Sequence, residues 1–410
     1  MQLFLFKRFV VCCFLFSVLG ACQSDLPVPA NHAITDQSGA MRKTLENRYV
    51  VVLKEGVGGL KVAQDSKLMK EQLRYLIGEM LGMQSMKNDR IAHIYSSGFI
   101  GFSAYLSEGE YKKLSQLPEV ASIEKDQEIT FRDIEPKINQ SAYAGRAGSV
   151  PGDLVPYGVE RVGGPLCYTG KNVVYVVDSG IDLQNEELNV NVSRGFNAIY
   201  TGEESSTLQD FNGHGTHVAG IIGAKMDGKG IVGVAAGATV IPIKIVDKDG
   251  RGTYSGILAA LDHIMIDGCK GDVVNVSLTG PVTPVLETSI EKASDKGINF
   301  VFAAGNESDH AKDYSPGRLN GKYFFTVSAM DENDVFAEFS NYGNPPIDWC
   351  APGVGVLSTW INGQYNFRSG TSYAAPHVAA LILQGGPVKD GLVKNDPDGD
   401  CDPIAVRKCP

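Results

Sequence analysis

Residues 173–180 read Val-Val-Tyr-Val-Val-Asp-Ser-Gly. The unbroken run of β-branched and aromatic residues predicts a strand that is buried on both faces, because a strand with one solvated face would alternate apolar and polar side chains. A similar run, Ile-Asn-Phe-Val-Phe, occupies residues 298–302. Helical stretches separate these runs. The chain therefore predicts an α/β fold in which helices cover both faces of a parallel sheet.

Two polar residues stand where such strands end. Asp178 follows the first run directly, and Asn306 follows Ala-Ala-Gly at the end of the second. In open α/β sheets, functional groups gather at the carboxyl ends of the strands. Both residues also have an ordinary interpretation, since Asp and Gly-Asn pairs commonly form turns.

A histidine and a serine each stand at the predicted start of a helix. His214 lies in Asn-Gly-His-Gly-Thr-His-Val-Ala-Gly (212–220), where the glycines leave room for an imidazole at a crowded helix start. A zinc site is the alternative, but His214 and His217 are three residues apart without an HExxH pattern, so we assign His217 a structural part. Ser372 lies in Ser-Gly-Thr-Ser-Tyr-Ala-Ala-Pro-His (369–377). Serine at this position is commonly only a cap, yet unpaired N–H groups and the helix dipole there also favour developing negative charge.

A smaller unit precedes the predicted sheet. The pattern predicts a strand at 48–53, a helix at 68–83, two short strands within 91–106, a helix at 108–117 and a strand at 120–123. This order is that of a ferredoxin-like α/β unit. The following stretch, 132–152, is rich in Pro, Gly, Ser, Asn and Ala and predicts an exposed linker that is open to cleavage.

The N-terminus carries an export signal. Lys7 and Arg8 precede an apolar run, 9–19, that is too short to span a bilayer comfortably, and Leu-Gly-Ala-Cys follows at 19–22. This ending resembles the lipobox of bacterial lipoproteins, in which Cys22 would be the lipidated first residue. The alternative is an ordinary secretory peptide with Cys22 incidental. Both interpretations predict export, either to the cell envelope as a lipoprotein or into the medium. The next segment, residues 23–46, is predicted to be a polar tether.

Composition excludes one class of partner. The net charge of -10 provides no concentrated basic surface for nucleic acid. An oxidising compartment permits disulfides, and the cysteines that remain beyond Cys22 are Cys167, Cys269, Cys350, Cys401 and Cys409. Their number is odd, so at least one thiol stays free or pairs between chains. We predict a local pair of Cys401 with Cys409, consider Cys167 with Cys269 as a second pair, and expect Cys350 to be a buried free thiol.

Taken together, four motifs resemble the subtilisin-like serine protease family (peptidase S8). They are Asp-Ser-Gly (178–180), His-Gly-Thr-His-Val-Ala-Gly (214–220), Ala-Gly-Asn (304–306) and Gly-Thr-Ser (370–372), in the family's order of Asp, His and Ser. The stretches 314–316, 339–343 and 357–360 resemble the proteinase K branch. The resemblance covers most of residues 156–385, and the leading unit resembles the family's inhibitor-like propeptide, with an independent binding domain as the alternative.

The resemblance implies a domain plan and a set of roles. The plan is a signal peptide (1–22), a tether (23–46), an inhibitor-like propeptide domain (47–131), a linker (132–152), a peptidase catalytic domain (153–385) and a C-terminal tail (386–410). The propeptide would assist folding and then block the cleft of its own chain. Ser372 would be the nucleophile, His214 its base and Asp178 the group that orients the imidazole, while Asn306 and the Ser372 N–H would stabilise the oxyanion. No cofactor takes part in this chemistry.

Substrate binding would use main-chain pairing of an extended peptide with two edge segments, which favours broad specificity. The candidate residues are Gly250, Gly252, Tyr254, Ser277, Leu278, Thr279 and Gly305. Tyr254 would form the floor of a hydrophobic subsite. Thr279 stands where relatives usually have Gly, which predicts a narrower or differently shaped primary pocket.

Calcium is a separate expectation. The resemblance to proteinase K implies a structural ion at Asp348, joined by backbone carbonyls near Lys322 and Phe324. Asp396, Asp398, Asp400 and Asp402 alternate around Gly399 and resemble a calcium loop, but a downstream bidentate Glu is lacking. We interpret that stretch as a solvated acidic turn.

Three functional hypotheses follow. The first is an exported, monomeric serine endopeptidase that cleaves polypeptide substrates and is made as a self-processed precursor. The others are a propeptide-locked or catalytically inactive relative that serves as a surface-anchored binding protein, and a processing enzyme with narrow sequence preference. An intact set of Asp178, His214, Ser372 and Asn306 weighs against the inactive relative.

Overall fold

The computed structural model describes residues 44–57, 66–82, 90–130 and 152–408. These residues belong to one compact unit, residues 42–410. The predicted signal peptide, Cys22, nearly all of the tether and the linker, and Cys409, lie outside the described residues. Within the described ranges, no helix is long and apolar enough to cross a membrane.

The leading unit has the predicted ferredoxin-like order of elements. It consists of β1 (Thr44–Leu53), α1 (Ser66–Leu81), β2 (Ile91–Tyr95), β3 (Gly101–Tyr105), α2 (Glu108–Ser115) and β4 (Val120–Thr130). Its antiparallel strands follow the order β4-β1-β3-β2, in which Val51 pairs with both Phe102 and Ile123. Leu73 and Ile77 of α1 pack with Val51 and Phe102 in one apolar core.

β4 is longer than the sequence predicted. Its second half, Glu124 to Thr130, is mostly polar and lacks a clear apolar alternation. The strand continues because its main chain pairs with β1 and then with β11 (Arg251–Thr253), a segment more than a hundred residues away. Tertiary pairing therefore overrides the weak local pattern.

The main sheet is parallel along most of its width. Its order is β20-β21-β17-β16-β14-β12-β6-β10-β7, and β8 also pairs with β10. The strands are β6 (Val174–Asp178), β7 (Asn189–Val190), β8 (Phe196–Asn197), β10 (Thr239–Lys244), β12 (Val273–Val276), β14 (Asn299–Ala303), β16 (Phe324–Met330), β17 (Ile347–Pro352), β20 (Pro387–Leu392) and β21 (Pro403–Arg407). The predicted buried strands are confirmed, since every residue of β6 is buried.

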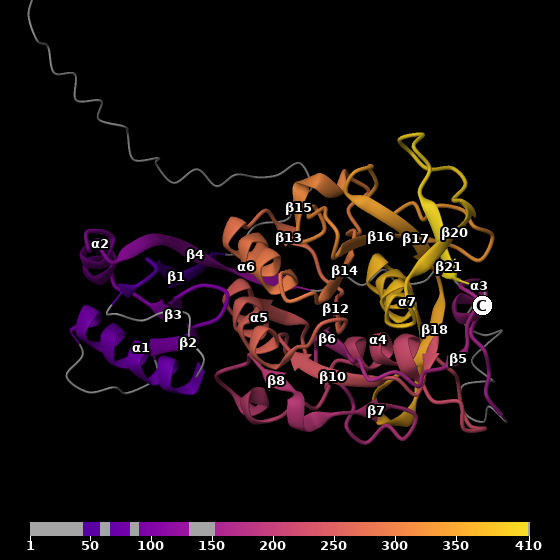
Figure 1. Ribbon diagram of the computed structural model, residues 1–410, viewed down its shortest axis with the longest axis horizontal. Coiled ribbons are helices and arrows are strands. Elements are labelled where there is room, and N and C mark those ends of the chain that lie inside the picture. The colour runs from indigo at the N-terminus through magenta and orange to yellow at the C-terminus, as the bar shows by residue number, and fades with distance from the viewer. Residues whose placement is uncertain (1–43, 58–65, 83–89, 131–151, 409–410) are drawn as a thin grey trace, which may run out of the picture. The chain divides into compact units, whose positions relative to one another are not determined.

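Helices cover both faces of this sheet, as the sequence predicted (Figure 1). On one face, α4 (His214–Gly223) and α7 (Thr371–Leu383) pack with residues such as Val176 and Val301. On the other face, α5 (Tyr254–Asp267) and α6 (Pro284–Ser294) pack with residues such as Tyr175 and Phe300. Alternate residues of each strand therefore enter opposite apolar cores.

Shorter elements complete the region. They are α3 (Tyr157–Arg161), β5 (Leu166–Cys167), β9 (Ala235–Ala236), β13 (Gly280–Pro281), β15 (Tyr314–Ser315), β18 (Val356–Thr359) and β19 (Tyr365–Arg368). The strands among these elements form three two-stranded pairs, β13-β15, β18-β19 and β5-β9.

The C-terminal stretch is not a separate tail. β21 pairs in parallel with β17, and β20 pairs antiparallel with β21, so both strands extend the main sheet. Val393 and Ile404 pack with Met330, Phe336 and Cys350 in a small apolar cluster. The sequence did not predict these strands because β20 is mostly exposed and contains Lys389, Asp390 and Gly391.

The cysteines differ in part from expectation. Cys350 is a buried free thiol, as predicted. The suggested Cys167–Cys269 pair is wrong, because both are exposed free thiols. Cys401 is also a free thiol in the structure, and its predicted partner, Cys409, lies outside the described residues.

Buried charges join the leading unit to the rest of the protein. Asp126 of β4 accepts hydrogen bonds from the Ser255 N–H (3.0 Å) and hydroxyl (2.6 Å) in the first turn of α5. Arg48 of β1 forms an ion pair with Asp126 at 2.8 Å, and both residues are almost fully buried. Farther along α5, Asp262 accepts hydrogen bonds from the N–H groups of Ser96 and Ser97 at 2.7 and 2.6 Å. The leading unit thus supplies hydrogen-bond and charge partners to one helix of the main region.

Replacement of Asp126 by Ala should strongly destabilise the precursor. The change leaves Arg48 buried without its carboxylate and the start of α5 without this acceptor, a loss of about 3–5 kcal/mol for a broken buried pair. The measurement is the urea unfolding midpoint in a Ser372→Ala background, which removes the predicted nucleophile. Glu108→Ala, at an exposed ion pair with Lys112, serves as the control and should change little. Equal midpoints for the two variants would show that the Arg48–Asp126 pair does not stabilise the precursor.

Candidate active site

Polar residues from several strands and helices meet at the carboxyl edge of the main sheet. Asp178 is the last residue of β6, Ser277 follows β12, and Asn306 lies beyond the end of β14. These three strands are parallel neighbours, so their ends lie at one edge. His214 begins α4 and Ser372 is the second residue of α7. All four predicted catalytic residues therefore lie at the carboxyl edge of the main sheet.

Asp178 and His214 are in direct contact. The His214 Nδ1 atom lies 2.8 and 2.9 Å from the two carboxylate oxygens of Asp178. Asp178 is 0% exposed and His214 is 1% exposed, so solvent does not screen this contact. The Asp178 carboxylate fixes the ring orientation and directs the opposite nitrogen, Nε2, away from itself.

The glycines on both sides of His214 are required by packing. Gly213 has φ of +107°, and a Cβ atom there would lie 2.3 Å from the Trp360 ring. A Cβ atom at Gly215 would lie 2.1 Å from the Gly180 carbonyl oxygen and 3.0 Å from the Asp178 carboxylate. A larger residue at position 215 would therefore push α4 away from β6 and separate His214 from Asp178.

His217 has a structural position, as predicted. Its Nε2 atom lies 3.1 Å from the Val356 carbonyl oxygen and 3.0 Å from that of Asn366. Burial lowers the pKa of His217 to about 3, so the ring is neutral near pH 7. A neutral donor that holds β18 and β19 explains this histidine without a metal.

Ser372 lies at the start of α7 and contacts the end of β12. Its hydroxyl donates to the Ser277 carbonyl at 3.0 Å, and the Ser277 hydroxyl donates to the Ser372 carbonyl at 2.8 Å. A hydroxyl has one proton, so in this conformation Ser372 does not donate to His214. The next residue, Tyr373, places the start of α7 beside His214, because the centroids of the two rings lie 5.1 Å apart. The backbone N–H of Ser372 lies in the first turn of α7, where it has no intrahelical acceptor.

Asn306 is oriented by the residue before Ser372. Its Oδ1 atom accepts hydrogen bonds from the Thr371 N–H and hydroxyl, both at 2.9 Å. The same hydroxyl accepts from the Gly305 N–H at 3.1 Å. Because Oδ1 is held by Thr371, the Nδ2 group is turned to the other side, near Gly370. The amide donor thus has a defined direction close to the start of α7.

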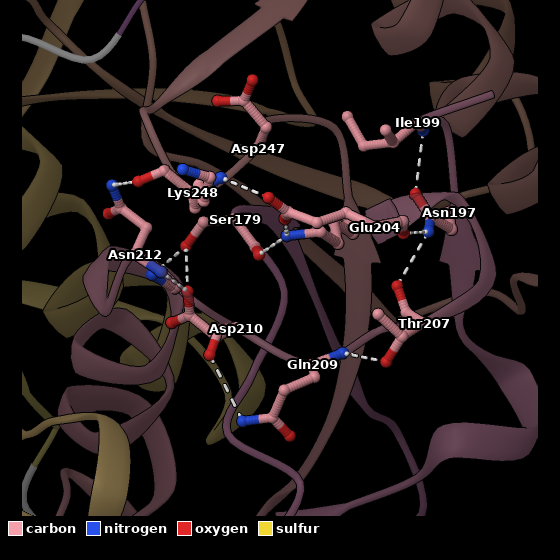
Figure 2. A network of polar contacts seen from close by, with 12 residues as sticks. Ser179, Asn197, Ile199, Glu204, Thr207, Gln209, Asp210, Asn212, Asp247 and Lys248 are labelled. Carbon is pink, nitrogen blue, oxygen red and sulfur yellow. Dashed lines mark hydrogen bonds and ion pairs between the residues drawn. The ribbon is translucent and has the colours of Figure 1, made fainter. Parts of the chain in front are cut away.

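A buried carboxylate that the sequence analysis missed connects Asp178 to His214. Asp210 accepts hydrogen bonds from the Ser179 hydroxyl and the N–H groups of Asn212 and Gly213, each at 2.9 Å, and from the Thr216 N–H and hydroxyl at 3.0 and 2.6 Å. Ser179 in turn accepts from the Gly215 N–H at 2.9 Å. Figure 2 shows Ser179 and Asn212 converging on Asp210. Asp210 thereby fixes the turn that carries His214 relative to the strand that carries Asp178.

The environment of Asp210 fits this positioning role. Burial raises the pKa of Asp210, and the surrounding N–H and hydroxyl donors oppose that rise. In the sequence, Asp210 stands four residues before His214 and resembles any turn-forming Asp. Its one distinguishing feature is the Asn-Gly-His run that follows it.

Lys244 is a second residue that the sequence analysis missed. It is 0% exposed at the end of β10, and its ammonium group donates to the Ser179 carbonyl at 2.6 Å. Glu204 forms an ion pair with the same group at 2.9 Å. Glu204 also accepts from the Lys248 N–H, as Figure 2 shows. The main chain just beyond Asp178 is therefore held from a second side.

One of the two predicted substrate edges already pairs with an extended strand. Gly252 of β11 pairs with Ile129 of β4, next to the pairs Arg251 with Thr130 and Thr253 with Glu128. Ile129 is buried in the same apolar cluster as Tyr254 and Leu278. This edge can therefore accept an extended chain and cover one of its apolar side chains.

The other predicted substrate residues are arranged differently. Ser277 is fully buried and bonded to Ser372, so its side chain faces the helix rather than an open edge. Thr279 is half-buried between Leu278 and β13. Gly250 and Gly305 have φ of +72° and +111°, and they lie beyond the carboxyl ends of β10 and β14. The structure does not assign them a ligand.

Asp348 is the residue predicted to hold calcium. It is half-buried, and one carboxylate oxygen accepts a hydrogen bond from the Thr326 N–H at 2.9 Å. Burial raises its pKa to about 6, with that hydrogen bond opposing the rise. Within the parts of the chain that the structure describes, no three His, Cys, Asp or Glu side chains are grouped as a metal site.

Comparisons with known proteins agree with this geometry. Residues 170–385 match the model of the Subtilase family, and residues 48–132 match that of Peptidase inhibitor I9. An extracellular serine proteinase of Thermus sp. (strain Rt41A) is 34% identical over 90% of this chain and 88% of its own. Subtilisin-like protease 2 of Pseudogymnoascus destructans is 32% identical over 88% and 86% of the two chains. The crystal structure of a cold-adapted subtilisin-like serine proteinase aligns with a TM-score of 0.54 and 27% identity, covering 62% of this chain and 98% of its own.

The chain therefore belongs to the subtilase family. Its leading unit is a propeptide of the I9 inhibitor type, and the protein is a serine endopeptidase. The resemblance that the four motifs predicted is confirmed.

Replacement of Asp210 by Asn should lower kcat by about 10²-fold with little change in KM. An amide cannot accept at both positions, so the turn that carries His214 shifts, and a displacement of ~1 Å can have an effect of this size. KM should remain unchanged because Asp210 is buried beneath the predicted triad, away from the bound substrate. Steady-state kinetics of the mature enzyme on a peptide substrate measures both constants. Asp227→Asn, at an exposed residue, is the matched control, and an unchanged kcat in the Asp210 variant would remove Asp210 from the catalytic arrangement.

Proposed function

We propose that this protein is an exported endopeptidase that hydrolyses peptide bonds through an acyl-enzyme, with Asp178, His214 and Ser372 as its triad. The observation that carries the proposal is the buried Asp178–His214 contact beside the start of α7, where Ser372 lies. This is the arrangement that activates a hydroxyl nucleophile.

The reaction begins when the Ser372 hydroxyl turns about χ1 from the Ser277 carbonyl to the His214 imidazole. His214 takes the proton at Nε2 while the Ser372 oxygen attacks the substrate carbonyl. Asp178 stabilises the imidazolium that forms. The new C–O bond converts the carbonyl oxygen into an oxyanion, which the Asn306 Nδ2 group and the Ser372 N–H stabilise. The C–N bond then breaks, and His214 returns the proton to the leaving amine.

Water completes the cycle by the same steps. His214 takes a proton from water as the water oxygen attacks the acyl-enzyme. Collapse of the second oxyanion releases the carboxylic acid and returns the proton to Ser372. Apart from water, each step uses only side chains and backbone groups of this chain, and the proposal includes no cofactor.

The substrate occupies the edge that β4 now covers. Main-chain pairing with β11 reads little side-chain information and favours broad specificity. An apolar substrate residue in the place of Ile129 would contact Tyr254 and Leu278. The side chain of Thr279 would narrow the neighbouring primary pocket.

Three parts of the proposal rest on the sequence and the family. Cys22 is proposed as a lipid anchor after export, Asp348 as a ligand of a structural calcium ion, and the protein as a monomer that cleaves its own linker. The half-buried, mostly uncompensated carboxylate of Asp348 fits a cation, with the backbone carbonyls near Lys322 and Phe324 as further ligands. This ion would stabilise the fold and take no part in catalysis.

Ser372→Ala should abolish labelling by a serine-directed organophosphonate and cause uncleaved precursor to accumulate. Both effects follow from loss of the nucleophile, and mass spectrometry of the purified protein measures both. Ser193→Ala, at an exposed serine, should label and mature normally. Labelling that persists in the Ser372 variant contradicts the nucleophile, while normal maturation without labelling shows that another protease cuts the linker. Failure of the parent enzyme to label would favour an inactive binding protein.

Activity should rise with pH between about 6 and 8, because His214 must be neutral to accept the Ser372 proton. The pH profile of kcat/KM on a small peptide ester or amide tests this expectation. A maximum well below neutrality would contradict His214 as the base. Peptide sequencing of digests of unfolded proteins separates broad from narrow specificity.

A further inference from the structure

The loop between β20 and β21 carries four aspartates within the run Asp-Pro-Asp-Gly-Asp-Cys-Asp at 396–402. The prediction of a solvated turn is wrong for its last member. Asp402 is 1% exposed, and Asp396 is half-buried, whereas Asp398 and Asp400 are exposed. Two of the four carboxyl groups are thus partly or wholly removed from water.

Three oxygen atoms in and beside this loop are buried without a hydrogen-bond partner. They are Oδ1 of Asp402, Oδ1 of Asp396 and Oδ1 of Asn344, the last from the segment before β17. The other oxygen of Asp402 accepts from the Ser328 hydroxyl. Buried acceptors normally find a donor, so three such atoms in one region need an explanation.

Hydrogen bonds place these atoms in one region. The Asp402 N–H donates to Oδ2 of Asp396 at 3.2 Å, and the Nδ2 group of Asn344 donates to the Asp400 carbonyl at 2.8 Å. Gly399 turns the chain with φ of +80°. The loop therefore folds back on itself, with Asn344 beside it.

Among the residues that the structure describes, no Lys or Arg forms an ion pair with Asp396 or Asp402. Lys394, the closest Lys in sequence, donates instead to the Asn333 carbonyl at 2.8 Å. Burial raises the pKa of Asp402 to about 7; hydrogen bonds from Ser328 and Asn344 oppose the rise, and the charge of Asp396 adds to it. Burial likewise raises the pKa of Asp396 to about 6, with the charge of Asp398 adding to it. The hydrogen bond from the Asp402 N–H to Asp396 brings these two residues together, and carboxylate oxygens gathered away from water are the ligands that Ca²⁺ prefers.

We propose that Asp396, Asp402 and Asn344 bind a Ca²⁺ ion through these three oxygens. Backbone carbonyls and water would complete the six to eight oxygen ligands that Ca²⁺ prefers. Two carboxylates with one amide oxygen agree with the finding that no three acidic, His or Cys side chains are grouped among the described residues. The ion would link the β20–β21 hairpin to the segment before β17. Its ligands are separate from Asp348.

Calcium titration of the Ser372→Ala precursor tests the proposal, because this background avoids self-digestion. After removal of metal with EGTA, isothermal titration with CaCl₂ counts the ions bound, and thermal unfolding with and without CaCl₂ measures their effect. Asp396→Asn/Asp402→Asn should bind one Ca²⁺ fewer per chain and show a smaller calcium-dependent rise in Tm. In EGTA the double variant should melt no lower than its parent, since it loses uncompensated carboxylates.

Three further variants make the outcome specific. Asp390→Asn removes one negative charge from β20 of the same hairpin and should keep the parent's ion count. Asp348→Asn reports on the separately predicted ion, and its effect should add to that of the double variant. Asn344→Ala should weaken Ca²⁺ binding at the proposed site by at least tenfold. This single variant replaces the double variant in the test if the double variant does not fold. If the double variant folds, an unchanged ion count and an unchanged calcium-dependent rise in Tm would overturn the proposal. If the double variant does not fold, an unchanged Ca²⁺ affinity in Asn344→Ala would overturn it.

Discussion

The buried contact between the Asp178 carboxylate and the His214 imidazole is the constraint on which the rest of the site depends. A carboxylate without exposure to water needs donors from its surroundings, and here the Ser179 N–H supplies one at 2.7 Å while the imidazole supplies another. Helix α4 must begin very close to β6 for this contact to form, so glycine is required at position 215, while the packing of Trp360 requires it at position 213. Asp210 then holds the two backbone segments together. The parallel sheet brings the ends of β12 and β14 to the same place, which adds Ser277 and Asn306.

Buried charged side chains between the propeptide and the rest of the chain likewise need hydrogen-bond partners. Asp126, Asp262 and Arg48 are almost fully buried, and each has a hydrogen-bond partner across the boundary between the two regions: Ser255 for Asp126 and Arg48, and Ser96 for Asp262. Neither region alone satisfies these groups as the precursor does. The main sheet is assembled from strands far apart in the sequence, a topology that folds slowly. A pre-formed antiparallel unit that supplies hydrogen-bond partners to α5 would help that assembly.

Much of this could be predicted from sequence because it has a local pattern. The β6 and β14 runs, the glycines around His214 and the apolar spacing within α1 each have a period or a composition that predicts their structure. Asp210 and Lys244 could not be predicted, because a turn aspartate and a lysine near a strand end are common, and only the tertiary fold makes them buried. The same holds for β20 and the second half of β4, whose polar residues form strands because a neighbour offers an edge. The Ser372 hydroxyl illustrates a finer limit, since sequence places the residue but not its rotamer.

The pairing of β4 with β11 has a consequence for how this precursor can diverge. Backbone groups form that ladder, so it depends little on the side chain at position 130, while Asp126 contacts a helix start and an arginine that accept few substitutes. Propeptides of this type can therefore vary at the end of β4 and still pair with β11. Exchange of propeptides between relatives should be governed by the carboxylate at the α5 terminus more than by overall identity.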